Sequence, residues 1–154
     1  MFIYLVQHAE AKSEQEDPSR SLSEKGMHDI IKVATHVSHL NLKIHMIFHS
    51  MKLRAKQTAE VLSERLNPAK GVSEIDGLAP LDDPTIWEKR LKDIPDDIIL
   101  VGHLPHLDKL SSLLLCGDKD KNIISFKMAG IVCIKRTETA SYALQWMVTP
   151  EIIT

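Results

Sequence analysis

The feature that most constrains the fold is a threefold alternation of a short apolar run with a longer stretch of helical periodicity. The short runs are Phe2–Gln7, Ile44–His49 and Ile98–Gly102. Their near-continuous apolar character is typical of strands that are covered on both faces. Strands that alternate with helices favour a parallel sheet between two helical layers. The sequence therefore predicts an α/β fold, a three-layer sandwich with a largely parallel central sheet flanked by helices.

The helical stretches begin near Ser23, Met51 and Pro105, directly after polar or proline-containing turns. Ser23 is suited to cap the first helix, while Leu22 and Met27 suit a hydrophobic staple around that cap. A shorter strand and a shorter helix are expected at 72–75 and 84–91. Two alternating runs, 131–135 and 142–148, predict an antiparallel hairpin on the sheet edge.

Size and composition limit the number of domains and the range of partners. With 154 residues, 44 % of them apolar, the chain can bury one substantial core, so a single domain over 1–154 is expected. A formal net charge of −2 provides no basic excess for nucleic acid or for an anionic membrane. The apolar run at the N-terminus is too short for a signal peptide or a membrane span, and a cytoplasmic protein is expected.

The cysteines and most of the histidines have structural or surface interpretations. Cys116 and Cys133 form no metal-type spacing, and both are expected to be buried as free, small apolar side chains. His49 is expected to be a hydrogen-bonded structural histidine. Surface positions are expected for the remaining helical and loop histidines, which are His28, His36, His39 and His45.

Chemical side chains gather where the three principal strands end. Gln7 and His8 close the first strand, Ser50 and then Arg54 follow the second, and His103 follows the third. Parallel sheets bind ligands at the carboxyl ends of their strands, beside helix N-termini that attract anions. Two imidazoles, a guanidinium and a helix N-terminus suit a phosphoryl group.

Four segments resemble the motifs of one enzyme family, in the order in which that family has them. They are LVQHA at 5–9, DPSRSLSEKG at 17–26, SMKLRAKQT at 50–58 and VGHLP at 101–105. Together they resemble the histidine phosphatase superfamily, also called phosphoglycerate-mutase-like, and within it the short SixA-type phosphohistidine phosphatases. A single triplet would be weak evidence, but the ordered set is specific.

The resemblance implies a role for each matching residue. His8 would be the nucleophile that becomes phosphorylated, His103 would stabilise the transferring group, and Arg54 would bind phosphate oxygens. The further phosphate-binding residues would be Gln7, Arg20 and Ser50. The resemblance implies no metal and no cofactor.

Two departures from the family pattern bear on rate and substrate. The arginine expected before the nucleophile is Gln7, which can donate a hydrogen bond but carries no charge. Gly77 stands where a glutamate acid would be expected, so that only Glu74 or Asp76 could serve instead. An imidazole leaving group departs from phosphorus with less help from a general acid than an alkoxide leaving group needs. These features predict phosphohistidine on a partner protein as the substrate, with inorganic phosphate as the product. The SixA-type resemblance implies a phosphotransfer domain as that partner.

Three alternatives stay open at this point. The chain could be a phosphate- or phosphoprotein-binding module whose turnover was weakened through Gln7. It could also be a small-molecule phosphomonoesterase of the same superfamily. A metal hydrolase built on His8, Glu10, His103 and His106 is a third possibility, since these spacings occur in zinc sites. Against this last reading, a surface position is expected for His106, just inside the helix that Pro105 opens.

Overall fold

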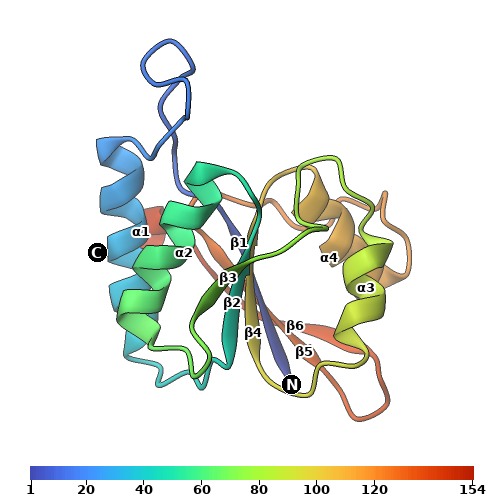
Figure 1. Cartoon of the computed structure of the whole chain (residues 1–154). Coiled ribbons are helices and arrows are strands. Elements are labelled where there is room, and N and C mark those ends of the chain that lie inside the picture. Colours follow the sequence, from blue (N-terminus) through green and yellow to red (C-terminus); the bar gives the residue numbers. More distant parts are fainter.

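The fold is organised around a six-stranded sheet (Figure 1), in a computed structural model that describes residues 1–154. The strand order is β3-β2-β4-β1-β5-β6. The strands are β1 (Phe2–Gln7), β2 (Met46–His49), β3 (Val72–Glu74), β4 (Ile98–Gly102), β5 (Ile131–Arg136) and β6 (Tyr142–Val148). The first four strands of this order pair in parallel, while β5 pairs antiparallel with β1 and β6 antiparallel with β5.

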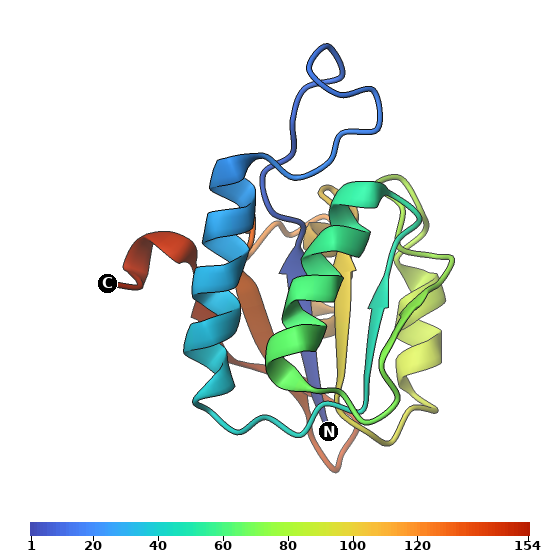
Figure 2. The same ribbon diagram turned by 60° about the vertical axis from the view of Figure 1, so that its left-hand side comes forward.

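Helices form the two outer layers. They are α1 (Glu24–Ser38), α2 (Leu53–Leu66), α3 (Thr85–Leu91) and α4 (His106–Cys116), followed by a 3₁₀ turn, η1 (Pro150–Ile152). One apolar cluster joins α1 and α2 to one face of the sheet, and a second joins α3 and α4 to the other (Figures 1 and 2). The expected three-layer α/β sandwich with a C-terminal antiparallel edge is therefore confirmed.

The register of the central strands sets where the functional residues lie. Leu5 is opposite Leu100, and Gln7 is opposite Gly102, so β1 and β4 end at the same level. His49 pairs with Val101 at the end of β2. The residues that follow these three strands therefore lie side by side at one edge of the sheet, the upper edge in Figure 2.

The start of α1 shows how local sequence fixes this edge. The Ser23 hydroxyl accepts a hydrogen bond from the Gly26 amide at 3.0 Å, as expected for an N-cap. A Cβ atom at Gly26 would lie 2.0 Å from the carbonyl oxygen of Glu10. The helix can approach the chain segment after β1 this closely only because position 26 has no side chain.

The expected second strand is shorter than its apolar run. It begins at Met46, because the carbonyls of Ile44 and His45 accept hydrogen bonds from the loop amides of Ala69 and Lys70 instead of continuing a regular ladder. The prediction for the cysteines is half wrong. Cys133 is buried in β5, whereas Cys116 is exposed because it is the last residue of α4.

A loop between β1 and α1 projects beyond the body of the molecule (Figures 1 and 2). An isolated bridge between Ala11 and Leu22 closes its base. Inside the loop, the Asp17 carboxylate accepts hydrogen bonds from the amides of Ser19 and Ser21 and from the Ser21 hydroxyl. These contacts hold the intervening Arg20 in a left-handed backbone conformation, with φ of 51°.

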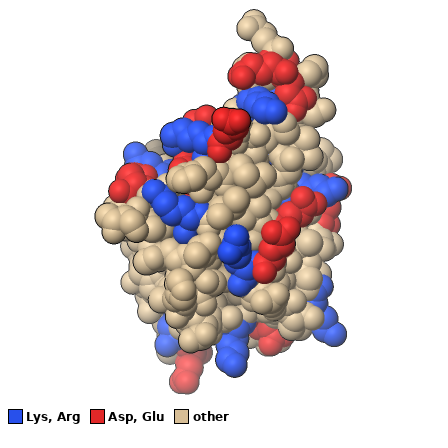
Figure 3. Space-filling model, turned by 90° about the vertical axis from the view of Figure 1, so that its left-hand side faces the viewer, with Lys and Arg blue, Asp and Glu red and all other residues tan.

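The surface on the side of α1 carries charges of both signs and no large patch of one sign. Figure 3 shows Lys and Arg side chains interspersed with Asp and Glu over this face. Lys25 and Asp29, one turn apart on α1, form one such pair, with 2.7 Å between Nζ and Oδ2. None of the helices combines the length and the apolar character that crossing a bilayer requires.

Candidate active site

Three neighbouring strands in the order β2-β4-β1 deliver Ser50, His103 and His8 to one place. Each of these residues directly follows its strand, and all three side chains are buried. The His8 amide donates to the Gly102 carbonyl at 3.0 Å, and the Ser50 amide donates to the Val101 carbonyl at 3.2 Å. These two backbone hydrogen bonds fix the three residues relative to one another.

His8 is held in a state suited to nucleophilic attack. Its Nδ1 lies 2.7 Å from the carbonyl oxygen of Ala9. A carbonyl only accepts, so Nδ1 carries the proton and Nε2 keeps its lone pair. Burial, aided by the charges of Arg54 and Arg20 and opposed by the Ala9 hydrogen bond, lowers the pKa of His8 to about 4. The ring is therefore neutral at neutral pH.

His103 faces His8 across the pocket. The two ring centroids are 5.0 Å apart and the ring planes are inclined at 50°. Nε2 of His103 lies 2.6 Å from the Ser50 hydroxyl oxygen, and that oxygen accepts a hydrogen bond from the Lys52 amide at 3.3 Å. Burial, followed by the charges of His8 and Arg54, lowers the pKa of His103 to about 3. In the neutral tautomer that carries its proton on Nε2, the ring can donate a hydrogen bond to an incoming oxyanion that replaces the Ser50 hydroxyl.

Two guanidinium groups complete the positive side of the pocket. Arg54 is the second residue of α2, and its Nε is buried without a hydrogen-bond partner. Burial, and secondarily the charge of Arg20, lowers the pKa of Arg54. Arg20 reaches in from the projecting loop, where its Nε donates to the Lys12 carbonyl at 3.1 Å. Neither arginine forms an ion pair with a carboxylate, so an anion would relieve their mutual repulsion.

Gln7 lies next to this group but shares no hydrogen bond with it. Its Oε1 is buried without a partner, while its backbone carbonyl accepts from the Ala129 amide at 3.0 Å. The unpartnered Oε1 can accept a hydrogen bond only from a protonated group of a ligand, whereas a hydrogen bond to a phosphate oxygen would have to come from Nε2. The structure thus brings His8, Ser50, Arg54 and His103 together, with Arg20 and Gln7 at the edges of the group.

Two polar residues of α2 support the site in ways that the motif alone did not specify. The Thr58 hydroxyl accepts from the Ala9 amide at 3.0 Å and donates to the Arg54 carbonyl at 2.7 Å. Gln57 Oε1 accepts from the Leu22 amide at 2.8 Å. Thr58 therefore ties the nucleophile's segment to the arginine's helix. Gln57 anchors the end of the projecting loop to the same helix.

A carboxylic acid at position 77 would be strained and tightly packed. The φ of Gly77 is +85°, and a Cβ atom there would lie 3.1–3.2 Å from the side chains of Ile86, Arg90 and Trp87. Asp76 instead pairs with Arg90, with 2.8 Å between Oδ1 and Nη2. Glu74 is exposed at the end of β3. Neither carboxylate forms a hydrogen bond to a residue of the pocket.

The expected surface position of His106 is wrong. Its side chain is fully buried, neither ring nitrogen has a hydrogen-bond partner, and burial lowers its pKa. The first turn of α4 packs against the apolar layer that contains Leu107, and this packing buries His106 as well. His49 is buried as expected, with Nδ1 2.7 Å from the Ser50 carbonyl oxygen.

The arrangement does not fit the metal hydrolase. No three His, Cys, Asp or Glu side chains of the chain are placed to hold one metal ion. The Glu10 carboxylate accepts from the Ser23 hydroxyl at 2.8 Å, which commits it to the start of α1. His8 and His103 are left as a pair without the further ligands that a zinc site needs.

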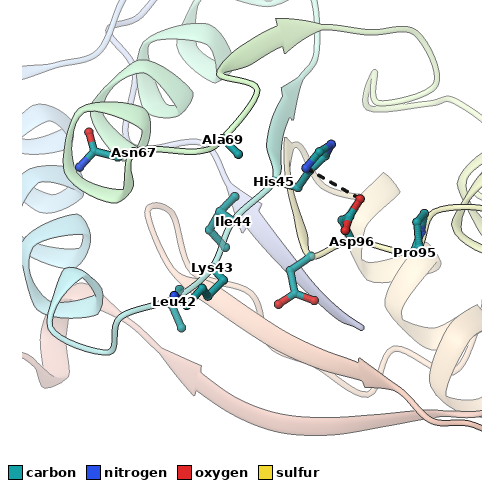
Figure 4. A pocket seen from close by; sticks show the side chains of 9 residues that line it. Leu42, Lys43, Ile44, His45, Asn67, Ala69, Pro95 and Asp96 are labelled. Carbon is teal, nitrogen blue, oxygen red and sulfur yellow. Dashed lines mark ion pairs between the residues drawn. The ribbon is translucent and has the colours of Figure 1, made fainter.

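A hollow of about 490 Å³ lies at the opposite edge of the sheet (Figure 4). Lys43, His45 and Asp96 line it, and His45 Nδ1 is 3.8 Å from Asp96 Oδ2. None of the clustered residues at the carboxyl ends of the strands contributes to this hollow. The chemistry is therefore confined to the other edge.

Comparison with known proteins matches this geometry to a family. The family model of the Histidine phosphatase superfamily (branch 1) matches residues 3–112, which include every residue of the pocket. The chain belongs to the histidine phosphatase superfamily. An uncharacterized protein of Picosynechococcus sp. is 33% identical over 143 residues, which cover 88% of this chain and 85% of that protein.

Solved structures extend the likeness at the level of the fold. The protein histidine phosphatase SixA complexed with tungstate superposes with a TM-score of 0.89 at 21% identity, and the match covers 100% of both chains. The alpha-ribazole phosphatase from Shigella flexneri superposes with a TM-score of 0.80 at 12% identity, with 97% of each chain covered. This histidine phosphatase therefore shares its fold both with a protein histidine phosphatase and with an alpha-ribazole phosphatase.

Proposed function

We propose that this histidine phosphatase removes the phosphoryl group from phosphohistidine on a partner protein by way of a phosphorylated His8. The observation that carries the proposal is the pair of neutral imidazoles beside two guanidinium groups that lack a carboxylate partner. Nε2 of His8 is a free nucleophile, and the cations would bind the phosphate oxygens.

The reaction proceeds in two displacements at phosphorus. Nε2 of His8 forms a bond to phosphorus while the bond from phosphorus to the substrate imidazole breaks, and that imidazole takes up a proton from solvent. A water molecule then forms a bond to phosphorus while the bond from phosphorus to Nε2 of His8 breaks, the water gives up a proton to solvent, and inorganic phosphate leaves. Arg54, Arg20 and the Nε2–H of His103 stabilise the charge on the transferring group in both displacements.

The choice of phosphohistidine rests on the leaving group. An alcohol must be protonated as it leaves, and position 77 is a glycine, which supplies no acid. An imidazole leaves as a weak base and needs no dedicated acid. The SixA likeness supports a phosphotransfer domain as the partner. Two free cysteines fit a reducing compartment such as the cytoplasm, which is part of the proposal. A role in signal transduction is also part of it, because the proposed substrate is a phosphotransfer domain.

The test is phosphoryl labelling followed by turnover. Labelled phosphoramidate should transfer an acid-labile, base-stable phosphate to the wild-type protein, which then releases it. His8→Asn should abolish both signals, while His36→Gln, on the exposed side of α1, should retain them. Turnover in His8→Asn would refute the covalent mechanism. Phosphate binding without labelling of the wild type would show the weakened module instead.

The second candidate is a small-molecule phosphomonoesterase, favoured by the fold shared with alpha-ribazole phosphatase. It predicts that alkyl and sugar phosphates are hydrolysed faster than phosphohistidine. Comparing kcat/KM for phosphohistidine, an aryl phosphate and an alkyl phosphate separates the two candidates. We expect the three rates to fall in that order.

A further inference from the structure

Large apolar side chains are exposed around the mouth of the pocket. Met51 is 70% exposed, Leu104 is 40% exposed and Met128 is 43% exposed. Met51 follows Ser50, and Leu104 follows His103. Met128 precedes Ala129, whose amide donates to the Gln7 carbonyl at 3.0 Å. Met51 and Leu104 are thus each next to a site residue, and Met128 is next to a residue that contacts Gln7. We call these three side chains the apolar rim.

The apolar rim spans the width of the catalytic edge. Its residues stand at the ends of β2 and β4 and at the start of β5, with β1 and His8 between the last two. Strands lie about 4.8 Å apart, so the three intervals from β2 to β5 separate these two strands, which Met51 follows and Met128 precedes, by about 14 Å. One phosphorylated residue in the pocket cannot contact both sides of a rim this wide. Contacts with the rim must come from the surface around that residue.

Cations accompany two members of the rim. Lys52 follows Met51, Lys127 precedes Met128, and both lysines are exposed. Neither takes part in any ion pair of the chain. The surface around the site therefore combines exposed apolar side chains with lysines that form no ion pair, a combination found in protein-docking surfaces. Carboxylates also lie near it: Glu74, Asp76 and Asp82 share a hollow with Met51, and Glu10 and Glu151 share one with Lys127 and Met128.

We propose that the apolar rim, with Lys52 and Lys127, is the docking surface for a folded phosphoprotein whose phosphohistidine is surrounded by apolar side chains and carboxylates. This inference rests on the proposed function and extends it from the phosphoryl group to the surface that carries it. The rim adds binding energy only for a folded partner, so it makes the enzyme selective for a phosphoprotein over free phosphohistidine or phosphoramidate.

The test compares two substrates on the same variants. The protein probe is a four-helix phosphotransfer domain phosphorylated on its exposed histidine, and the small probe is phosphoramidate. The triple variant Met51→Ser/Leu104→Ser/Met128→Ser should lower the ratio of kcat/KM for the protein probe to that for phosphoramidate by about thirtyfold. Leu40→Ser and Leu144→Ser are matched controls, because these side chains are 49% and 50% exposed away from the pocket. They should leave the ratio unchanged.

The charges are tested separately. Lys127→Glu should lower kcat/KM for the protein probe severalfold at low ionic strength, and high salt should remove the difference. Lys43→Glu, at the opposite edge of the sheet, is the control.

Different outcomes refute different claims. A wild-type enzyme that hydrolyses phosphoramidate but not the protein probe would refute the proposed phosphoprotein substrate. A wild type active on both, with a triple variant whose ratio stays within about threefold, would refute the docking surface alone. A wild-type dimer that the triple variant converts to a monomer would assign the rim to a second copy of the chain and overturn the inference.

Discussion

Acidification should destabilise the fold through the two facing histidines well before carboxylates begin to titrate. The pKa of His8 falls to about 4 and that of His103 to about 3 in the folded protein, from an ordinary value of 6.5. Both changes arise first from burial. Between pH 6.5 and the lowered pKa of each histidine, the unfolded chain binds a proton that the folded chain does not bind. The stability of the fold is therefore complete above pH 6.5 and decreases as the pH falls below 6.5.

The magnitude follows from these pKa values. At pH 5 each histidine is almost fully protonated in the unfolded chain and almost fully neutral in the folded one, which removes roughly 2 kcal/mol per residue relative to pH 8. The pair therefore removes on the order of 4 kcal/mol, a large part of the 5–15 kcal/mol that typically stabilises a domain. His106, whose pKa burial also lowers, adds a loss of the same sign.

The assay is urea unfolding between pH 8 and pH 5 in a buffer without phosphate, because a bound anion would itself stabilise the folded state. His8→Asn and His103→Asn should each flatten the pH dependence of the free energy of unfolding by about 2 kcal/mol. His36→Gln should leave the slope unchanged. If both active-site variants keep the wild-type slope, the imidazoles are not held neutral by burial, and our description of the nucleophile fails.

Three further substitutions test the site and its support. Gln7→Arg should increase kcat/KM for phosphoramidate by about tenfold, because a guanidinium replaces a neutral amide beside the phosphate; no gain, together with strong coupling to Arg20, would indicate a pocket rebuilt around the amide. Arg54→Ala should weaken inhibition by inorganic phosphate and raise KM by about tenfold, and an effect on kcat alone would contradict its placement against phosphate oxygens. Gly26→Ala should lower the free energy of unfolding by about 3 kcal/mol in urea titrations, since its Cβ would lie 2.0 Å from the Glu10 oxygen; a change below 1 kcal/mol would mean that α1 can shift without loss.

The fold was predictable because local and global signals agree along most of the chain. The buried strands β1 and β4 are apolar throughout, and α1 has both its cap and its apolar stripe. The convergence of His8, Ser50 and His103 follows from one rule, that parallel strands end at the same edge. The motif order then identified the family that the comparison confirms.

The features that were mispredicted or missed all depend on packing between distant parts of the chain. His106 and Cys116 lie at the two ends of α4, where burial depends on how the helix packs and not on its own sequence. The left-handed backbone of Arg20 depends on hydrogen bonds to Asp17 that no periodicity announces. The contacts of Thr58 needed the relative positions of β1 and α2. Tertiary packing decides each of these features, so a single sequence does not contain them in a form that can be read locally.

The position of β4 between β1 and β2 has a consequence for how the enzyme comes into being. His8 and Ser50 are synthesised early, but the strands that carry them do not pair with each other. β1 pairs with β4 and β5, β2 pairs with β3 and β4, and β4 is the strand that joins the two. During synthesis, neither can take its final place until residues 98–102 have emerged and entered the gap. Until β4 has been synthesised, the nascent chain therefore carries His8 without the residues that surround it in the folded protein. The ability to transfer phosphate arises when β4 pairs with β1 and β2.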